Sequence, residues 1–234
     1  RDLYTKRFID SRDVEQTNKE LFKTWADQYG EDSDFFKVRV RGVFPSAGTV
    51  QFIGTDLVDK SLVDDMYVAP SDPVVMGVDV ARFGSDSSVI WTRHGRDCAV
   101  HPYRKFNGVD TMALASYVVE EAAKHNPDAI FLDETGLGAG VLDRCRQLGL
   151  EVIGINFGAK ATQAGLANMR AQMYQNLKDA MASGIRLPDD QDLRSDLTGM
   201  EYGFNLRSEI QLEKKSDMLK RGLASPDLAD ALAL

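Results

Sequence analysis

Three apolar segments between residues 74 and 106 place the strongest constraint on the fold. VVMGVDVA (74–81), SSVIWTR (87–93) and CAVHPYRKF (98–106) have the length and the β-branched or aromatic content of strands. Only the short turns RFGSDS and HGRD join them. Because short turns connect antiparallel neighbours, the sequence predicts a meander of three antiparallel strands.

The next 50 or so residues change to alternating helix and strand. Residues 110–125 carry a helical apolar stripe with Asp110 placed to cap the first turn. DAIFLDETG (128–136) and LEVIGINF (150–157) are typical of strands, and a helical segment separates them. Because a helix connects these two strands, we expect them to pair in parallel. The predicted fold class is therefore α/β, with a mixed five-stranded sheet of three antiparallel strands then parallel strands, flanked by helices.

The regions on either side of this sheet predict further elements. Before it, we expect a helix ending at Gly30, a strand in 35–45 and a short helix in 54–63. Proline and aspartate at 71–73 suggest a domain boundary near residue 70, which separates residues 1–70 from residues 71–234. After the sheet, the expected elements are helices within 168–184 and 189–200, a strand in 208–213 and a final helix from Ser225.

Composition excludes several classes of protein. Hydrophobic content of 43% and charged content of 27% are ordinary for a soluble protein, and no apolar run nears the roughly 18–20 residues that span a bilayer. Cys98 and Cys145 lack zinc-ligand spacing and are expected to be reduced thiols. The net charge of −8 argues mildly against a protein that coats nucleic acid. The abrupt start, without methionine or signal pattern, suggests a fragment of a longer chain.

Aspartates in apolar surroundings are the main candidates for chemistry. Asp79 lies inside the first apolar segment, where a carboxylate is costly unless it is paired or bound to a metal ion. Asp133 ends a second apolar segment, at the edge where α/β sheets present functional groups. Adjacent strand residues face opposite ways, so only one of Asp133 and Glu134 can share the face of Asp79; the pattern slightly favours Asp133.

Two more aspartates lie near the C-terminal end. Asp227 and Asp230 are three residues apart and share one face of the final helix. Aspartate ligands without nearby histidine or cysteine pairs favour Mg²⁺ or Mn²⁺ over Zn²⁺, and two such ions can hydrolyse a phosphodiester.

Several acids also have a simpler explanation, and Asp79 is the hardest to explain in that way. Asp227 follows Ser-Pro and could merely favour a helix N-terminus, Asp133 could be a turn residue, and Asp86 is better explained as a hairpin residue. A basic cluster precedes the final helix and is either a solvated face or a phosphate contact; it comprises Lys214, Lys215, Lys220 and Arg221.

Three segments resemble, in order and spacing, the C-terminal nuclease domain of the large terminase subunit of tailed bacteriophages and prophages. They are VMGVDVARFGSDSSVI, IFLDETGLGAGVLDRCRQLG and IQLEKKSDMLKRGLASPDLADALAL. The lead-in YGEDSDFFKVRVRGVFP is similar to the family's connection between ATPase and nuclease. The resemblance covers nearly the whole chain and implies a ribonuclease H-like fold.

The resemblance also implies a site and a setting. By matching positions, the metal ligands are Asp79, Asp133 and the candidates Asp227 and Asp230, with Lys214 fitting a family lysine near the site. Two Mg²⁺ or Mn²⁺ ions are implied as cofactors. Residues 1–70 then form the connection after an N-terminal ATPase domain, and residues 71–234 form the nuclease.

The resemblance implies that the chain cuts concatemeric double-stranded DNA. It also implies that the chain acts in the host bacterial cytoplasm and is absent from the mature virion. Its implied partners are the portal protein and the small terminase subunit, and no membrane is involved. Three alternatives stay open: a resolvase-like nuclease for Holliday junctions, a sugar-kinase-like ATP-binding domain, and a domain that mainly docks portal or small terminase.

Overall fold

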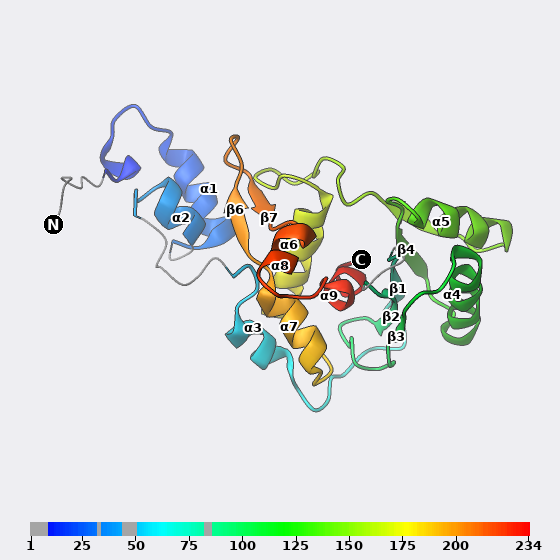
Figure 1. Ribbon diagram of the computed structural model, residues 1–234. Coiled ribbons are helices and arrows are strands. Elements are labelled where there is room, and N and C mark those ends of the chain that lie inside the picture. Colours follow the sequence, from blue (N-terminus) through cyan, green and yellow to red (C-terminus); the bar gives the residue numbers. More distant parts are fainter. Residues whose placement is uncertain (1–8, 32–33, 44–50, 82–85) are drawn as a thin grey trace. The chain divides into compact units, whose positions relative to one another are not determined.

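The structure is a computed structural model that describes residues 9–31, 34–43, 51–81 and 86–234 (Figure 1). By compactness the chain divides into two units, residues 1–50 and 51–234. The boundary near residue 70 between a connection and a nuclease domain stays a prediction. No helix in the described ranges combines the length and apolarity that crossing a membrane requires.

The first unit is helical where it is described. A 3₁₀ turn, Ser11–Asp13, precedes α1 (Lys19–Tyr29), which ends as predicted at Gly30 with a φ of 79°. The strand predicted in 35–45 is wrong, because α2 spans Asp34–Arg39 and the Val40 N–H donates to the Phe36 carbonyl at 2.8 Å. Phe36 and Val40 are four residues apart and both buried, so their spacing fits a helix face as well as a strand. Residues 44–45 of that segment lie outside the described residues.

The second unit begins with α3 (Thr55–Ser61) and contains the predicted mixed sheet. Its order is β3-β2-β1-β4-β5, with strands Val74–Asp79, Ser88–His94, Arg104–Phe106, Ala129–Asp133 and Ile153–Ile155 for β1 to β5. Strands β1, β2 and β3 are antiparallel neighbours, whereas β4 is parallel to β1 and β5 is parallel to β4. The predicted fold class is confirmed.

Strand β3 is shorter than the predicted segment 98–106. The Cys98 N–H donates to the Arg186 carbonyl rather than to β2, and Pro102 has no N–H to donate. Only Arg104–Phe106 therefore pair with β2.

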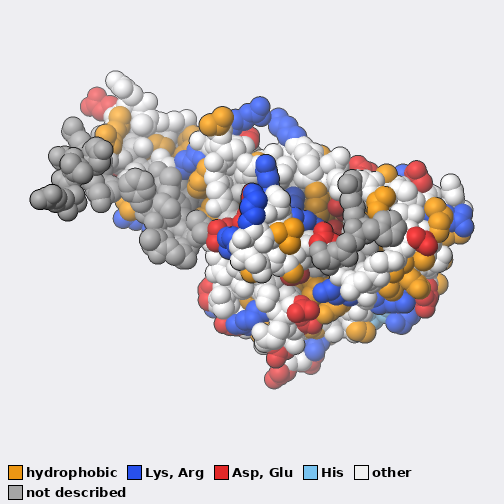
Figure 2. All heavy atoms as spheres, in the orientation of Figure 1, with side chains coloured by type: hydrophobic (Ala, Val, Ile, Leu, Met, Phe, Trp, Pro, Cys, Tyr) orange, Lys and Arg blue, Asp and Glu red, His pale blue; other side chains and the backbone are white. Residues whose placement is uncertain are grey.

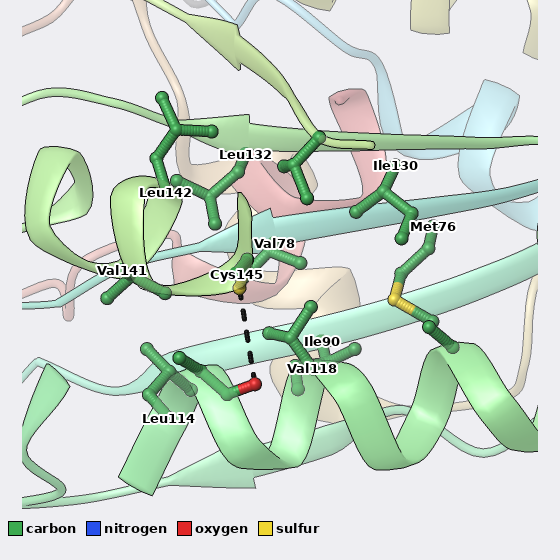
Figure 3. Close-up of a cluster of buried hydrophobic side chains, with 13 residues drawn as sticks. Met76, Val78, Ile90, Leu114, Val118, Ile130, Leu132, Val141, Leu142 and Cys145 are labelled. Carbon is green, nitrogen blue, oxygen red and sulfur yellow. Dashed lines mark hydrogen bonds between the residues drawn. The ribbon is translucent and has the colours of Figure 1, made fainter. Parts of the chain in front are cut away.

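One face of the sheet holds a hydrophobic core under α4 (Thr111–His125) and α5 (Gly138–Gln147). Figure 3 shows Val78 of β1 near Leu132 of β4 and Met76 near Ile130, with Val118 of α4 and Cys145 of α5 facing them. Asp110 caps α4 as predicted, accepting from the Ala113 N–H at 2.8 Å. Two helices packed side by side over alternate strand residues explain why this face is mainly apolar.

The opposite face of β1 and β2 is covered by α9 (Asp227–Ala233), which α6 (Met169–Ala182) and α7 (Gln191–Gly199) contact in turn. Gly77 permits this approach, since a Cβ there would lie 2.1 Å from the Ala231 carbonyl oxygen. Side chains alternate along a strand, so Met76 and Val78 enter the core while Gly77 and Asp79 face α9.

A separate hairpin joins these helices. It pairs β6 (Tyr202–Phe204) with β7 (Ile210–Leu212), and α8 (Lys215–Lys220) follows it. The segment 208–213 thus forms a strand as predicted, but in this hairpin and not in the main sheet. Neither β6 nor α8 is predicted by the sequence pattern.

Candidate active site

The four predicted aspartates come together from three elements. Asp79 and Asp133 end β1 and β4, which are parallel neighbours with Val78 opposite Leu132, so both carboxylates leave the same edge of the sheet. Asp227 and Asp230 come from the first turn of α9 on the Asp79 side. Their exposed fractions are 1%, 7%, 5% and 0% in chain order, a degree of burial that is exceptional for ionisable groups.

One lysine contacts three of these acids. The Nζ of Lys215 lies 2.8 Å from Oδ2 of Asp230, 3.6 Å from Oδ1 of Asp227 and 3.9 Å from Oδ2 of Asp79. Burial alone would lower the pKa of Lys215, but Asp230 and Asp79 outweigh it and raise the pKa, so the ammonium stays charged. Lys214, the lysine that the family resemblance indicates, instead lines a separate pocket between the hairpin and α8.

Among the described residues, Asp230 has three charged or hydrogen-bonding partners: Lys215, Tyr174 and Arg170. Its Oδ1 accepts from the Tyr174 hydroxyl at 2.8 Å and from Nε of Arg170 at 3.2 Å. Burial would raise the pKa of Asp230, but Arg170 and Lys215 together hold it below its usual value. Arg170 also donates to the Glu213 carbonyl at 3.0 Å, which ties α6 to the segment that carries Lys215.

The carboxylates of Asp79 and Asp227 accept fewer hydrogen bonds than that of Asp230 does. Neither carboxylate oxygen of Asp79 has a hydrogen-bond partner, and the same holds for Oδ1 of Asp227, whereas Oδ2 of Asp227 accepts from the Ser87 N–H at 2.7 Å. Burial raises the pKa of Asp79 well above its usual range and also raises that of Asp227, with Lys215 opposing both shifts. Buried acceptors without donors are costly, so these oxygens are poised for a cation.

Asp133 and Glu134 point to different places. Asp133 lines the cleft, where Thr135 donates to it from its N–H at 3.0 Å and from its hydroxyl at 2.8 Å. Burial raises the pKa of Asp133, and the Thr135 bonds oppose this shift. Glu134 turns towards β5, because a Cβ on Gly154 would lie 2.2 Å from its Oε2. Asp133 is therefore the member of this pair that faces the other acids.

The acids open onto a cleft of about 390 Å³. Asp133, Asp227 and Lys215 line it together with Asp86 and Arg170, whereas Asp79 and Asp230 are not among its lining residues. The sequence interpretation named Lys215 only as one of a basic cluster that could contact phosphate, did not include Arg170, and explained Asp86 as a hairpin residue. Figure 2 shows acidic side chains over α9 next to Lys and Arg side chains over α8, on the same face of the molecule.

The donor set suits a hard divalent cation, because carboxylate oxygens are the ligands that Mg²⁺, Mn²⁺ and Ca²⁺ prefer. As the side chains stand, no three Asp, Glu, His or Cys residues in the described part of the chain are arranged around one ion position. The Lys215 ammonium lies among the acids and neutralises part of their charge. The residues fit a metal ion chemically through the partnerless oxygens of Asp79 and Asp227.

Comparison with known sequences gives one informative relative. The chain is 25% identical over 245 residues to a probable terminase large subunit of Enterobacteria phage P7, covering 96% of this chain and 49% of that protein. The chain thus spans about half the length of this curated relative. No protein-family model matches the chain.

Comparison with solved structures shows the fold of terminase nuclease domains. The nuclease domain of the large terminase subunit gp2 of bacterial virus Sf6 superposes with a TM-score of 0.67 at 20% identity, covering 78% of this chain and 96% of that domain. The large terminase nuclease of thermophilic phage G20c with bound magnesium has a TM-score of 0.60 at 16% identity, covering 81% and 96%. The resemblance to terminase nuclease domains is thereby confirmed, and the chain has their ribonuclease H-like fold.

Proposed function

We propose that this chain is a metal-dependent endodeoxyribonuclease that hydrolyses phosphodiester bonds at the cleft beside β1, β4 and α9. The observation that carries the proposal is the set of buried carboxylate oxygens of Asp79 and Asp227 that no protein donor satisfies. Burying such oxygens without a donor lowers the stability of the free protein. A cation that binds them offsets this desolvation cost, and the offset contributes to its binding free energy.

Asp79, Asp133 and Asp227 are the proposed metal ligands, since Asp133 and Asp227 line the cleft and Asp79 ends the strand next to β4 with both carboxylate oxygens lacking a hydrogen-bond partner. Asp230 is proposed as an outer partner, because Tyr174 and Arg170 already occupy its Oδ1. Two Mg²⁺ or Mn²⁺ ions bound here would supply an activated water and stabilise the leaving oxygen. Solved terminase nucleases support this choice: the Sf6 domain with manganese and with calcium, and the G20c domain with bound magnesium and with bound cobalt.

Lys215 is the proposed counter-charge for the scissile phosphate. Its ammonium balances the acids in the free protein and lines the same cleft. Arg170 shares this wall and adds a second fixed cation. Lys214 lines the neighbouring pocket on the far side of the turn into α8, where we propose contact with the DNA backbone rather than with the reacting group.

The substrate we propose is concatemeric double-stranded DNA, cut in the host cytoplasm during packaging of a viral genome. The match to a probable terminase large subunit supports this setting. The proposed partners follow from it: an ATPase domain on the same polypeptide, the portal protein and the small terminase subunit. The Lys and Arg side chains over α8 offer a basic surface for DNA despite the overall charge of −8.

Plasmid cleavage tests the proposal directly. Supercoiled plasmid, linear DNA and a four-way junction are incubated with the protein in Mn²⁺, Mg²⁺ or EDTA. We expect nicking and linearisation with a divalent ion, none in EDTA, and a loss of at least about 100-fold in Asp79→Asn and Asp227→Asn. Asp217→Asn is the matched control, because that acid is exposed and pairs with Lys220.

Two results would contradict the proposal: no cleavage by the wild-type protein with any ion, or undiminished cleavage by Asp79→Asn. Preference for the four-way junction over duplex DNA would favour a junction-resolving nuclease instead.

A further inference from the structure

Helix α9 carries two of the four acids but has no capping side chain of its own. Its N-cap residue is Pro226, which makes no side-chain hydrogen bond to the first turn. The first turn is buried, so its free N–H groups need acceptors from elsewhere in the protein.

Asp196 of α7 supplies that acceptor from 32 residues away. Its Oδ2 accepts from the Leu228 N–H at 3.0 Å, and the Ala229 N–H also donates to this carboxylate. Asp196 does not enter the cleft of the acids. It lines a different, smaller cavity with Lys105 and Ser225, so it acts on the site through its hydrogen bonds to α9 and through its charge, which lies near Asp227 and Asp230.

This cap leaves Asp227 free for another role. Asp227 is the first residue of α9, and a carboxylate at that position is a natural partner for the N–H groups of its own helix. In the structure it does not take that role. Its Oδ2 accepts from the Ser87 N–H, and its buried Oδ1 lies 3.6 Å from the Lys215 ammonium, on a side chain that lines the cleft.

We propose that Asp196 is a positioning residue that caps α9 in place of Asp227 and so keeps the Asp227 carboxylate directed into the metal-binding cleft. The inference rests on the proposed function for its consequence, the metal affinity, but the cap itself is independent of that function. Asp196 thereby joins the site although it touches neither the metal ligands' oxygens nor the cleft.

The test compares Asp196→Ala with Asp196→Asn. Both remove the negative charge next to α9, but only asparagine keeps a side-chain oxygen that can accept the Leu228 N–H. The difference between them therefore isolates the hydrogen bond from the charge. The control is Asp110→Ala, which removes a cap of the same type from α4, far along the chain from the acids.

Three readouts are measured on the whole chain: amide exchange at Leu228 and Ala229, the carboxyl ¹³C shift of Asp227 in metal-free protein, and Mn²⁺ affinity by calorimetry. In Asp196→Ala we expect exchange to accelerate at least tenfold, the Asp227 shift to move, and Mn²⁺ affinity to fall at least tenfold. In Asp196→Asn, the exchange rates, the Asp227 shift and the Mn²⁺ affinity should all be close to those of the wild type. Asp110→Ala should accelerate exchange at Ala113 only.

The proposal is overturned if Asp196→Ala leaves the exchange or the Asp227 shift unchanged, or if asparagine recovers nothing. A wild-type protein that binds no Mn²⁺ contradicts the proposed function instead, while the exchange and the metal-free shift still decide whether Asp196 positions Asp227. If the alanine variant does not fold, Asp196→Asn against Asp196→Leu makes the same comparison, because leucine fills a similar volume without an acceptor oxygen.

Discussion

The ammonium of Lys215 lies 2.8 Å from a carboxylate oxygen of Asp230 that is itself fully buried. This pair joins α8 to α9, as does the contact of the same ammonium with Asp227 at 3.6 Å. The Lys215 ammonium therefore supplies positive charge among the acids. The Lys215 side chain keeps 36% of its surface exposed, so it can withdraw towards solvent when another cation binds.

Replacing Lys215 by methionine tests this balance of charge. Without metal, we expect the free energy of unfolding to fall by about 1–3 kcal/mol, less than for a fully buried ion pair because Lys215 is partly exposed. Urea unfolding in EDTA measures the loss, and Mn²⁺ should recover more stability in this variant than in the wild type. Lys214→Met is the matched control; an equal loss there would contradict the assignment of Lys215.

Removing the Asp79 carboxylate should make the metal-free protein more stable. Asp79 is buried, and neither of its oxygens has a hydrogen-bond partner, so Asp79→Asn relieves a desolvation cost of about 1–3 kcal/mol. The same change should abolish the rise in Tm that Mn²⁺ gives the wild type. Thermal unfolding with and without Mn²⁺ checks both effects; a destabilised variant that still responds fully to Mn²⁺ would refute this prediction.

Gly77→Ala should displace α9 from the sheet. The new Cβ would lie 2.1 Å from the Ala231 carbonyl oxygen, which belongs to helix backbone and cannot rotate away. We expect a loss of about 1–3 kcal/mol in urea unfolding and weaker DNA cleavage. Gly203→Ala, in β6, is the control: nothing lies within 4 Å of its added Cβ, so its stability should change by no more than about 0.5 kcal/mol.

Both thiols should resist alkylation in the folded protein. Burial raises the pKa of Cys98 to about 12 and that of Cys145 to about 11. A raised pKa lowers the thiolate fraction at pH 8 by roughly tenfold per unit, so iodoacetamide should modify neither residue until the chain unfolds. Ser216→Cys provides an exposed thiol on α8 as a positive control. Rapid native labelling of Cys98 or Cys145 would show that its surroundings open.

Sequence patterns located the sheet because its strands are apolar and separated by clear turn signals. The same reasoning placed Asp79 and Asp133 at neighbouring strand ends, where the structure has them. The strand predicted in 35–45 rested on Val38 and Val40 alternating with basic residues. That pattern was misleading because Phe36 and Val40, four residues apart and both buried, also fit a helix face. Sequence reasoning missed β6 because three residues are too few to establish any period.

The rest of the site depends on contacts that local patterns do not contain. Arg170 and Tyr174 reach Asp230 across 60 and 56 residues, and nothing in the helix that holds them marks them as partners of an acid. Lys214 and Lys215 are adjacent in a run of charges, and successive residues entering a helix point about 100° apart. Which of the two faces the acids is settled only by where α8 begins.

Alternation along β1 has a consequence for how the chain assembles. Met76 and Val78 enter the apolar core, while Gly77 and Asp79 face α9. A slip of one residue against β2 would exchange the two sets, pressing a carboxylate into hydrocarbon and a methionine against the Ala231 carbonyl. A register slip therefore costs free energy on both faces of the strand at once, so the side chains that build the site also specify the correct pairing of β1 with β2.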